Sequence, residues 1–221
     1  MKIRGALLAA ILGLLLLLLL LGAVGGAGNA WDVAIVEALG RLRHADPGLT
    51  EVAILLTGIG SVYSTVGLPI AAAIGLAAAG LRQRAALLIA TVLVERLTVD
   101  VIKALINRPR PAFDLHPVSA ASASFPSGHA ANSMTAFVAI AMFVAPPRFR
   151  RPAIAFAGAA AVAIALTRPF LGVHWPSDTL GGWAVSAMFL LAARQFATRQ
   201  GLLAQEKHQI VARHRPALDQ D

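Results

Sequence analysis

Long apolar segments separated by short polar turns constrain the fold of this chain more than any other feature of its sequence. The first segment, residues 6–26, is long enough to cross a hydrocarbon layer about 30 Å thick as a helix. Backbone N–H and C=O groups in lipid must find partners within their own segment, so each span is expected to be helical. The sequence therefore predicts an all-α fold, an integral membrane six-helix transmembrane bundle, with spans at 6–26, within 52–80, and at 85–106, 128–145, 153–167 and 177–195.

The composition supports the same class of protein. Of the 221 residues, 57% are hydrophobic and 14% are charged, whereas a soluble domain is nearer about one quarter charged. We expect one membrane domain, residues 1–200, followed by a polar cytoplasmic tail, residues 201–221. The net charge of +8 does not indicate nucleic acid as a partner, because the basic residues lie just beyond the apolar segments and form no single patch. The expected partner is the lipid bilayer.

The basic residues also predict an orientation. Arginines at 82–84 and 148–151, together with both termini, are expected on the cytoplasmic side. Residues 29–51, 107–127 and 168–176 then lie together on the opposite face. We expect 29–51 to be an external loop with a short interfacial helix, ended by Pro47-Gly48. Residues 6–26 also resemble a signal peptide, since small residues follow, but their apolar run exceeds a signal core of about 7–15 residues, so a retained helix is favoured.

Three polar clusters fall on the face opposite the arginine-rich turns. They are KALINRPRP (residues 103–111), FPSGHAANS (125–133) and TRPFLGVHWPSD (167–178). A charged residue at a membrane boundary is usually an interfacial anchor, and a single histidine there is usually incidental. That interpretation does not suit two histidines, an aspartate and several cations on one small surface.

The residue types in these clusters match an anion site. Ser127 is expected to cap the helix that follows it, which leaves the N–H groups of Gly128 and His129 pointing outward. As an isolated residue Ser127 would be interpreted only as a cap. Lys103 offers a point charge, whereas arginines bind oxyanions through two parallel N–H donors. These donors indicate an anion with several oxygens, such as a phosphate.

The two histidines add chemistry to this site. His174 precedes Asp178 by four residues, so the carboxylate is expected to hold one ring nitrogen and leave the other free to attack phosphorus. His129, from another helix, is expected to protonate the leaving oxygen.

At these residues the chain resembles the type-2 phosphatidic acid phosphatase family, membrane lipid phosphate phosphatases that are related to vanadium haloperoxidases. The family pattern is Lys-x6-Arg-Pro, then Pro-Ser-Gly-His, then Ser-Arg-x5-His-x3-Asp. All three spacings hold over residues 103–178, with one departure, since Thr167 stands where the family has serine.

The resemblance implies a role for each matching residue. His174 would form a phosphohistidine, Asp178 would support it and His129 would protonate the leaving group. The phosphate oxygens would be held by Lys103, Arg110, Ser127, Gly128 and Arg168. No metal and no cofactor are expected. Arg108, Pro126 and Thr167 are candidate supporting residues, and Arg108, which lies outside the pattern, is either a substrate contact or an anchor.

The span at 85–106 carries more charge than an anchor needs. Arg96, Asp100 and Lys103 fall within a 60° arc of the helix when it is drawn at 100° per residue, with Glu95 at 80° from Lys103. Arg96 and Asp100 are spaced to pair. Asp100 is therefore another candidate supporting residue, either by orienting Lys103 or as part of a structural pair. We expect this stripe to face protein rather than lipid.

These inferences predict a phosphatase in the cell inner membrane, with its site on the periplasmic face. The expected substrate is a phospholipid or isoprenoid phosphate, monoester or diphosphate, such as phosphatidic acid, phosphatidylglycerophosphate, undecaprenyl diphosphate or lipid A. Two alternatives stay open, namely a lipid phosphotransferase that uses the same phosphohistidine and a binder of lipid phosphates without catalysis. The sequence indicates no oligomeric state.

Overall fold

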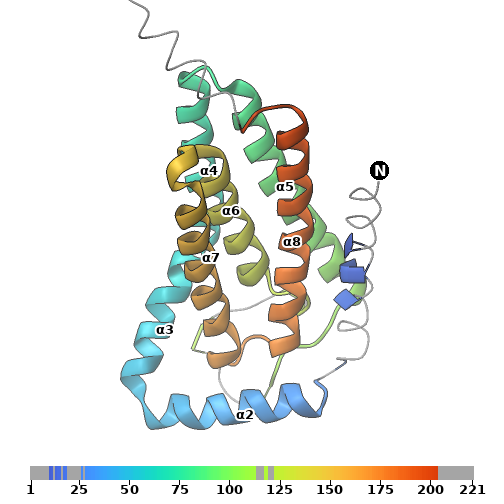
Figure 1. Ribbon diagram of the computed structural model, residues 1–221. Helices are drawn as coiled ribbons and strands as arrows, with labels where there is room; N and C mark the ends of the chain where they lie inside the picture. Colours follow the sequence, from blue (N-terminus) through green and yellow to red (C-terminus); the bar gives the residue numbers. More distant parts are fainter. Residues whose placement is uncertain are drawn as a thin grey trace, which may run out of the picture.

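A computed structural model describes residues 10–11, 13–15, 17–18, 26, 28–112, 117–118 and 122–203. Every regular element named within these ranges is a helix (Figure 1). In chain order they are α2 (Ala30–Ala45), α3 (Pro47–Ile59), α4 (Val62–Ala78), α5 (Arg82–Ile106), α6 (Gly128–Val144), α7 (Pro147–Phe170) and α8 (Pro176–Arg199).

The helices α4 to α8 run alternately up and down the bundle, while α2 lies across one end of it (Figure 1). The turns α4–α5 and α6–α7 are at the far end from α2. The segment between α5 and α6 and the turn between α7 and α8 are at the same end as α2. Within the described residues, the three stretches expected to share one face therefore lie at the same end of the bundle.

Local signals in the sequence define where most helices begin and end. Ser127 caps α6 by accepting a hydrogen bond from the N–H of Ala130, as expected. Pro147 and Pro176 occupy the first turns of α7 and α8, where proline loses no intrahelical hydrogen bond. Asn107 ends α5 in a left-handed conformation, which asparagine tolerates better than most residues.

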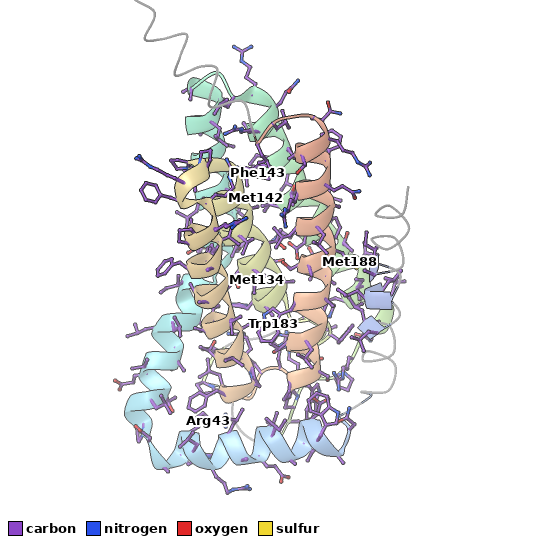
Figure 2. The ribbon with its side chains drawn as sticks, in the orientation of Figure 1. Arg43, Met134, Met142, Phe143, Trp183 and Met188 are labelled. Carbon is purple, nitrogen blue, oxygen red and sulfur yellow. The ribbon has the colours of Figure 1, made fainter. Side chains whose placement is uncertain are left out.

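The segment expected as an external loop with a short interfacial helix, 29–51, is almost entirely helical, so the helix is longer than expected and its predicted end needs correction. Asn29 caps α2 through the N–H of Asp32, and the helix runs for 16 residues. Pro47-Gly48 does not end α2 but begins α3, because proline fits a first helical turn and Asp46 accepts a hydrogen bond from the N–H of Leu49. Arg43 reaches from α2 toward the end of α7 (Figure 2), where it donates to the carbonyl of Phe170 at 2.8 Å.

The segment expected as one span within 52–80 is two helices, α3 and α4, separated at Gly60–Ser61. Glycine is needed at this break, since a Cβ on Gly60 would lie 2.4 Å from a side-chain carbon of Ile164 and 3.2 Å from the ring of His129. The break therefore brings backbone against the start of α6.

Among the described residues, three helical segments are long and apolar enough to cross a membrane: Pro47–Ala78, Pro147–Phe170 and Pro176–Arg199. Helix α6 is apolar but shorter, and α5 carries the charged stripe. Most of the predicted span at 6–26, and residues 204–221 of the predicted tail, lie outside the described residues. The count of six spans thus stays a prediction.

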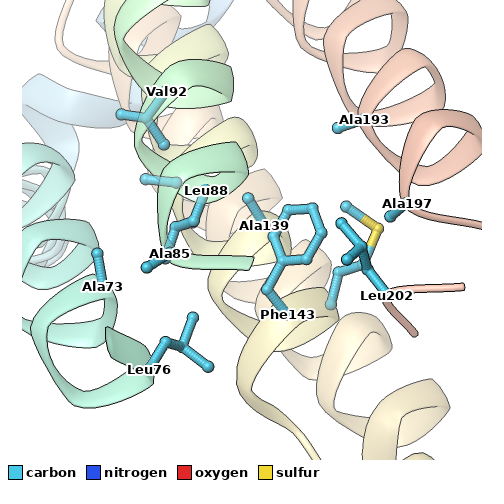
Figure 3. Close-up of a cluster of buried hydrophobic side chains, with 12 residues drawn as sticks. Ala73, Leu76, Ala85, Leu88, Val92, Ala139, Phe143, Ala193, Ala197 and Leu202 are labelled. Carbon is cyan, nitrogen blue, oxygen red and sulfur yellow. The ribbon is translucent and has the colours of Figure 1, made fainter. Parts of the chain in front are cut away.

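The bundle interior away from α2 is filled by small and branched side chains. A cluster that includes Leu88, Val92, Ala139 and Phe143 joins α4, α5, α6 and α8 (Figure 3). In lipid, tails and side chains are equally apolar, so close packing rather than release of water holds such helices together.

Contact between α6 and α8 depends on glycine. A Cβ on Gly182 would lie 2.6 Å from the carbonyl oxygen of Ser127 and 2.9 Å from the Cβ of Ala130. A Cβ on Gly181 would lie 2.4 Å from the ring of Phe125. The absence of side chains at 181 and 182 therefore lets the PSGH turn sit directly on the first turns of α8.

The charged stripe on α5 is only partly inside, contrary to expectation. Glu95 is fully buried and Asp100 is exposed, and Arg96 forms no ion pair with Asp100 in the structure. The buried face of the helix contains Val92, Glu95 and Val99. Asp100 follows Val99 directly, so its side chain points about 100° away from this face.

Candidate active site

The three polar clusters meet at the end of the bundle that α2 crosses. Lys103, near the end of α5, donates to the carbonyl oxygen of Ala123 at 2.6 Å. Arg110 donates to the carbonyl oxygen of Val173, and the N–H of Ser127 donates to the carbonyl oxygen of Asp178 at 2.9 Å. We call this region the pocket and define it by Lys103, Arg110, Ser127, Gly128, His129, Arg168 and His174.

His174 is buried in the turn between α7 and α8, and both of its ring nitrogens have partners. Nδ1 lies 3.2 Å from a carboxylate oxygen of Asp178, and Nε2 lies 3.1 Å from a guanidinium nitrogen of Arg110. An ionised carboxylate only accepts hydrogen bonds and a guanidinium only donates, so these partners select the tautomer protonated at Nδ1. The Nε2 lone pair then faces the cation of Arg110.

The environment of His174 keeps its ring neutral. Burial lowers the pKa of His174 from 6.5 to about 3, Arg110 and Lys103 act in the same direction, and Asp178 opposes them. Burial also lowers the pKa of Arg110, although a guanidinium stays charged at neutral pH. A neutral imidazole beside a permanent cation is suited to nucleophilic attack on an anionic group.

Asp178 has more hydrogen-bond partners than His174, the one partner that the i, i+4 spacing predicts. Its oxygens accept hydrogen bonds from the N–H of Trp175 at 2.8 Å, from the hydroxyl of Ser124 and from the guanidinium of Arg108 at 2.6 Å. The carboxylate is therefore fixed in place and remains charged beside His174.

The anion donors converge on the first turn of α6. A Cβ on Gly128 would lie 3.9 Å from the side-chain carbon Cε of Lys103, so the lysine runs past the unobstructed backbone of the glycine. Arg168 is 4% exposed and donates to the hydroxyl of Thr57 at 2.7 Å. Within the described residues its Nε has no hydrogen-bond partner. A buried donor without a partner costs free energy, which an anion in the pocket would recover.

His129 lies in the first turn of α6, on the side of the pocket next to the α3–α4 break. Its ring is close to Gly60, and the charges of Arg168, Arg110 and Lys103 act on it. Arg110 and Lys103 act on His174 as well. The two imidazoles thus share the same group of cations.

Three of the candidate supporting residues have no polar contact with the pocket. The hydroxyl of Thr167 donates to the carbonyl of Ile164 in its own helix at 2.6 Å. Pro126 is buried in the turn before Ser127. Asp100 is exposed and acts on Lys103 only through its charge.

Arg108 is neither an interfacial anchor nor exposed to a substrate. It is 2% exposed, and its guanidinium binds carboxylates from two helices, Asp32 of α2 and Asp178 of α8. Sequence reasoning found Arg108 but missed Asp32, Ser124 and Thr57. None of these three lies in a motif, and each reaches the site only through the tertiary fold.

Together, the fold and the site define a class of protein: a helical membrane protein in which several cations and two histidines gather at one end of the bundle. Residues 84–202 match the sequence profile of the PAP2 superfamily, and the chain belongs to this superfamily. It is a multi-pass membrane protein of the PAP2 fold.

Known relatives are similar over part of the chain. Phosphatidylglycerophosphatase B of Bacillus subtilis is 33% identical over 108 residues, which cover 46% of this chain and 52% of that protein. The lipid A 1-phosphatase of Rhizobium johnstonii is 37% identical over 122 residues, 51% of this chain and 48% of that protein. The chain thus spans about half the length of the curated relatives it matches.

Structural similarity extends further than sequence similarity. The crystal structure of a transmembrane PAP2 type phosphatidylglycerolphosphate phosphatase from Bacillus subtilis superposes with a TM-score of 0.77 at 29% identity. The match covers 86% of this chain and 96% of that one.

Proposed function

We propose that this protein is a lipid phosphatase that hydrolyses phosphate monoesters or diphosphates of membrane lipids through a phosphohistidine at His174. The observation that carries the proposal is the orientation of this ring, with Nδ1 toward Asp178 and Nε2 toward Arg110. The relatives named above support the same reaction class, since they are lipid phosphatases.

The first step would be in-line attack of the Nε2 lone pair on phosphorus. The bond from phosphorus to the leaving oxygen breaks, and His129 supplies the proton that this oxygen takes up, which requires that the ring be protonated once the anionic substrate lies among the surrounding cations. Charge that develops on the phosphoryl oxygens is met by the cations of Lys103, Arg110 and Arg168 and by the N–H groups at the start of α6.

The second step would release the phosphate. His129, now neutral, accepts a proton from water as the water oxygen attacks phosphorus. The bond between Nε2 and phosphorus breaks, inorganic phosphate leaves and His174 returns to its neutral form. Asp178 holds the N–H at Nδ1 throughout, and this stabilises the positive charge that the ring gains when it is phosphorylated.

The pocket lies at one end of the bundle, where an amphiphile can place its headgroup while its chains remain in lipid. We propose that this end is periplasmic, in the cell inner membrane, because the arginine-rich turns lie at the other end. Substrates to be tested first are phosphatidylglycerophosphate and lipid A 1-phosphate, followed by phosphatidic acid and undecaprenyl diphosphate.

The proposal is tested with purified protein in detergent, one lipid phosphate at a time, by release of inorganic phosphate. We expect His174→Ala to abolish turnover and to prevent acid-labile labelling of the protein from a radioactive phosphate donor, while the variant still folds and inserts. His44→Ala, an exposed position on α2, is the matched control and should keep full activity.

Other outcomes would revise the proposal. Substantial phosphate release by a folded His174→Ala variant would exclude this residue as the nucleophile. Release that begins only after an acceptor lipid or sugar is added would indicate phosphotransfer. Binding of lipid phosphates with no turnover of any substrate would indicate a binding protein.

A further inference from the structure

A buried network of charges extends from His174 to a helix outside the segment that the superfamily profile matches. Asp32 belongs to α2, which precedes residues 84–202, and its exposed fraction is 0%. Its carboxylate pairs with Arg108 at 2.7 Å, and Arg108 pairs with Asp178 at 2.6 Å. Asp178 in turn lies 3.2 Å from Nδ1 of His174. The chain of contacts thus runs Asp32, Arg108, Asp178, His174.

The guanidinium of Arg108 lies between the two carboxylates with its orientation determined on every side. One terminal nitrogen donates to Asp32, and the other donates to Asp178 and to the hydroxyl of Ser177 at 2.6 Å. Its Nε donates to the carbonyl of Gly26 at 2.9 Å, and the group stacks 5.6 Å from the ring centre of Trp175. These contacts fix the guanidinium, so Arg108 cannot turn to bind a substrate.

Asp32 also holds the first turn of α8 directly. One of its oxygens accepts from the N–H of Ser177 at 2.9 Å, and the other accepts from the hydroxyl of Ser177 at 2.6 Å. A carboxylate at a helix N-terminus satisfies a free N–H group and is stabilised by the helix dipole. Asp178 is the next residue, so α2 determines the position from which this carboxylate reaches His174.

The charges of the network give Asp32 a second effect. Asp32 and Asp178 share the single positive charge of Arg108, so the three residues carry one net negative charge next to His174. Without the charge of Asp32, Arg108 would neutralise Asp178. The carboxylate would then stabilise less well the positive charge that the ring gains when Nε2 attacks phosphorus.

We propose that Asp32 is a positioning residue for the reaction, which acts on His174 through Arg108 and Asp178 and does not contact the substrate. The inference rests on the proposed phosphatase function. It makes α2 part of the catalytic machinery, not only a cover over the end of the bundle.

The test replaces the charge of Asp32 while keeping its shape. Asp32→Asn should lower kcat about 10- to 100-fold, because Arg108 would then neutralise Asp178 and the first turn of α8 would be held less firmly, and even small displacements of a reacting group have effects of this size. KM should change less than twofold, since Asp32 lies outside the pocket. Glu37→Gln on the exposed side of the same helix is the matched control and should keep wild-type kinetics. Thermal melting of each purified variant establishes that it is folded.

A double variant separates the charge effect from loss of structure. In Asp32→Asn combined with Arg108→Gln, Asp178 regains an unshared negative charge, so part of the kcat lost in Asp32→Asn should return. A merely structural role predicts that the second substitution adds further loss. If Asp32→Asn does not fold, Arg108→Lys, which keeps the charge without the two-armed bridge, should lower kcat with little change in KM.

Three results would overturn the inference. A folded Asp32→Asn variant with wild-type kcat excludes a positioning role. A raised KM with unchanged kcat in this variant indicates that Asp32 contacts the substrate. Further loss of kcat in the double variant indicates a structural role. If Asp32→Asn does not fold, unchanged kcat in Arg108→Lys also excludes the role. Failure of the proposed function is distinguishable, because the wild-type protein would then release no phosphate and form no phosphohistidine, and this inference would fail with it.

Discussion

His174 satisfies two requirements of a nucleophile, since it is held in one tautomer and it is kept neutral. The tautomer follows from the contacts with Asp178 and Arg110, and the neutral state follows from burial among cations. Because these come from residues in two separate stretches, 103–111 and 167–178, the state of His174 depends on the assembled site. Because folding lowers the pKa of His174, the free energy of unfolding depends on pH.

We expect the free energy of unfolding to fall as the pH is lowered from 6.5 toward 3, with a contribution from His174. The pKa of His174 is about 3 in the folded protein and ordinarily 6.5, so in this interval the unfolded chain binds the additional proton. The slope from this one group is at most about 1.4 kcal/mol per pH unit. Thermal melting in detergent between pH 4 and pH 7 should show a shallower acid decline for His174→Gln than for the wild type. The control His44→Gln should follow the wild type, and equal slopes for His174→Gln and wild type would contradict the assignment.

At the scale of elements, the site depends on how closely α6 approaches α8. The PSGH turn supplies Ser127, Gly128 and His129, whereas α8 supplies Asp178. The hydrogen bond from the N–H of Ser127 to the carbonyl of Asp178 joins them, and Gly182 leaves the space for it. Small residues at such a crossing are common between membrane helices, because they allow backbones to come together.

Gly182→Ala should therefore reduce both stability and activity. The new Cβ would lie 2.6 Å from a backbone oxygen, which cannot move without displacing the turn. We expect a lower melting temperature and a loss of kcat of about tenfold or more. Gly158→Ala on α7 is the control, since no heavy atom lies within 4 Å of the added carbon. It should be neutral or stabilising by up to about 1 kcal/mol. Similar effects of the two substitutions would show that helix propensity, not close approach, explains the result.

At the scale of the whole molecule, α2 and the turn between α7 and α8 lie at one end of the bundle, and the arginine-rich turns α4–α5 and α6–α7 lie at the other end (Figure 1). This arrangement predicts that α2 and the turn between α4 and α5 lie on opposite sides of the membrane. The chain has no cysteine, so single cysteines can be introduced without background labelling.

We expect Arg41→Cys, exposed on α2, to react with a membrane-impermeant maleimide added outside intact spheroplasts. Gln83→Cys, exposed at the start of α5, should react only after the membrane is permeabilised. The measurement is the labelled fraction of each variant before and after permeabilisation. Labelling of both positions from the same side would contradict the bundle orientation, and the reverse pattern would place the pocket on the cytoplasmic side.

Much of this molecule is determined by local sequence. The helical class follows from apolar segments that must satisfy their own backbone, and the start of α6 follows from Ser127, whose side chain caps it. The contact of His174 with Asp178 follows from their separation of four residues across the start of α8. These features depend on residues within a few positions of each other, so the sequence alone was sufficient to predict them.

Other features were decided by the tertiary structure. Asp32 and Arg108 are 76 residues apart, Asp32 and Ser177 are 145 apart, and no local pattern predicts either contact. The break at Gly60 and the burial of Glu95 in place of Asp100 depend on which helices pack against which face. The spacing of apolar residues indicates that a helix has a buried face. Which residues lie on that face is determined by the helices that pack against it. For this reason the motif residues could be predicted, whereas the network that orients them could not.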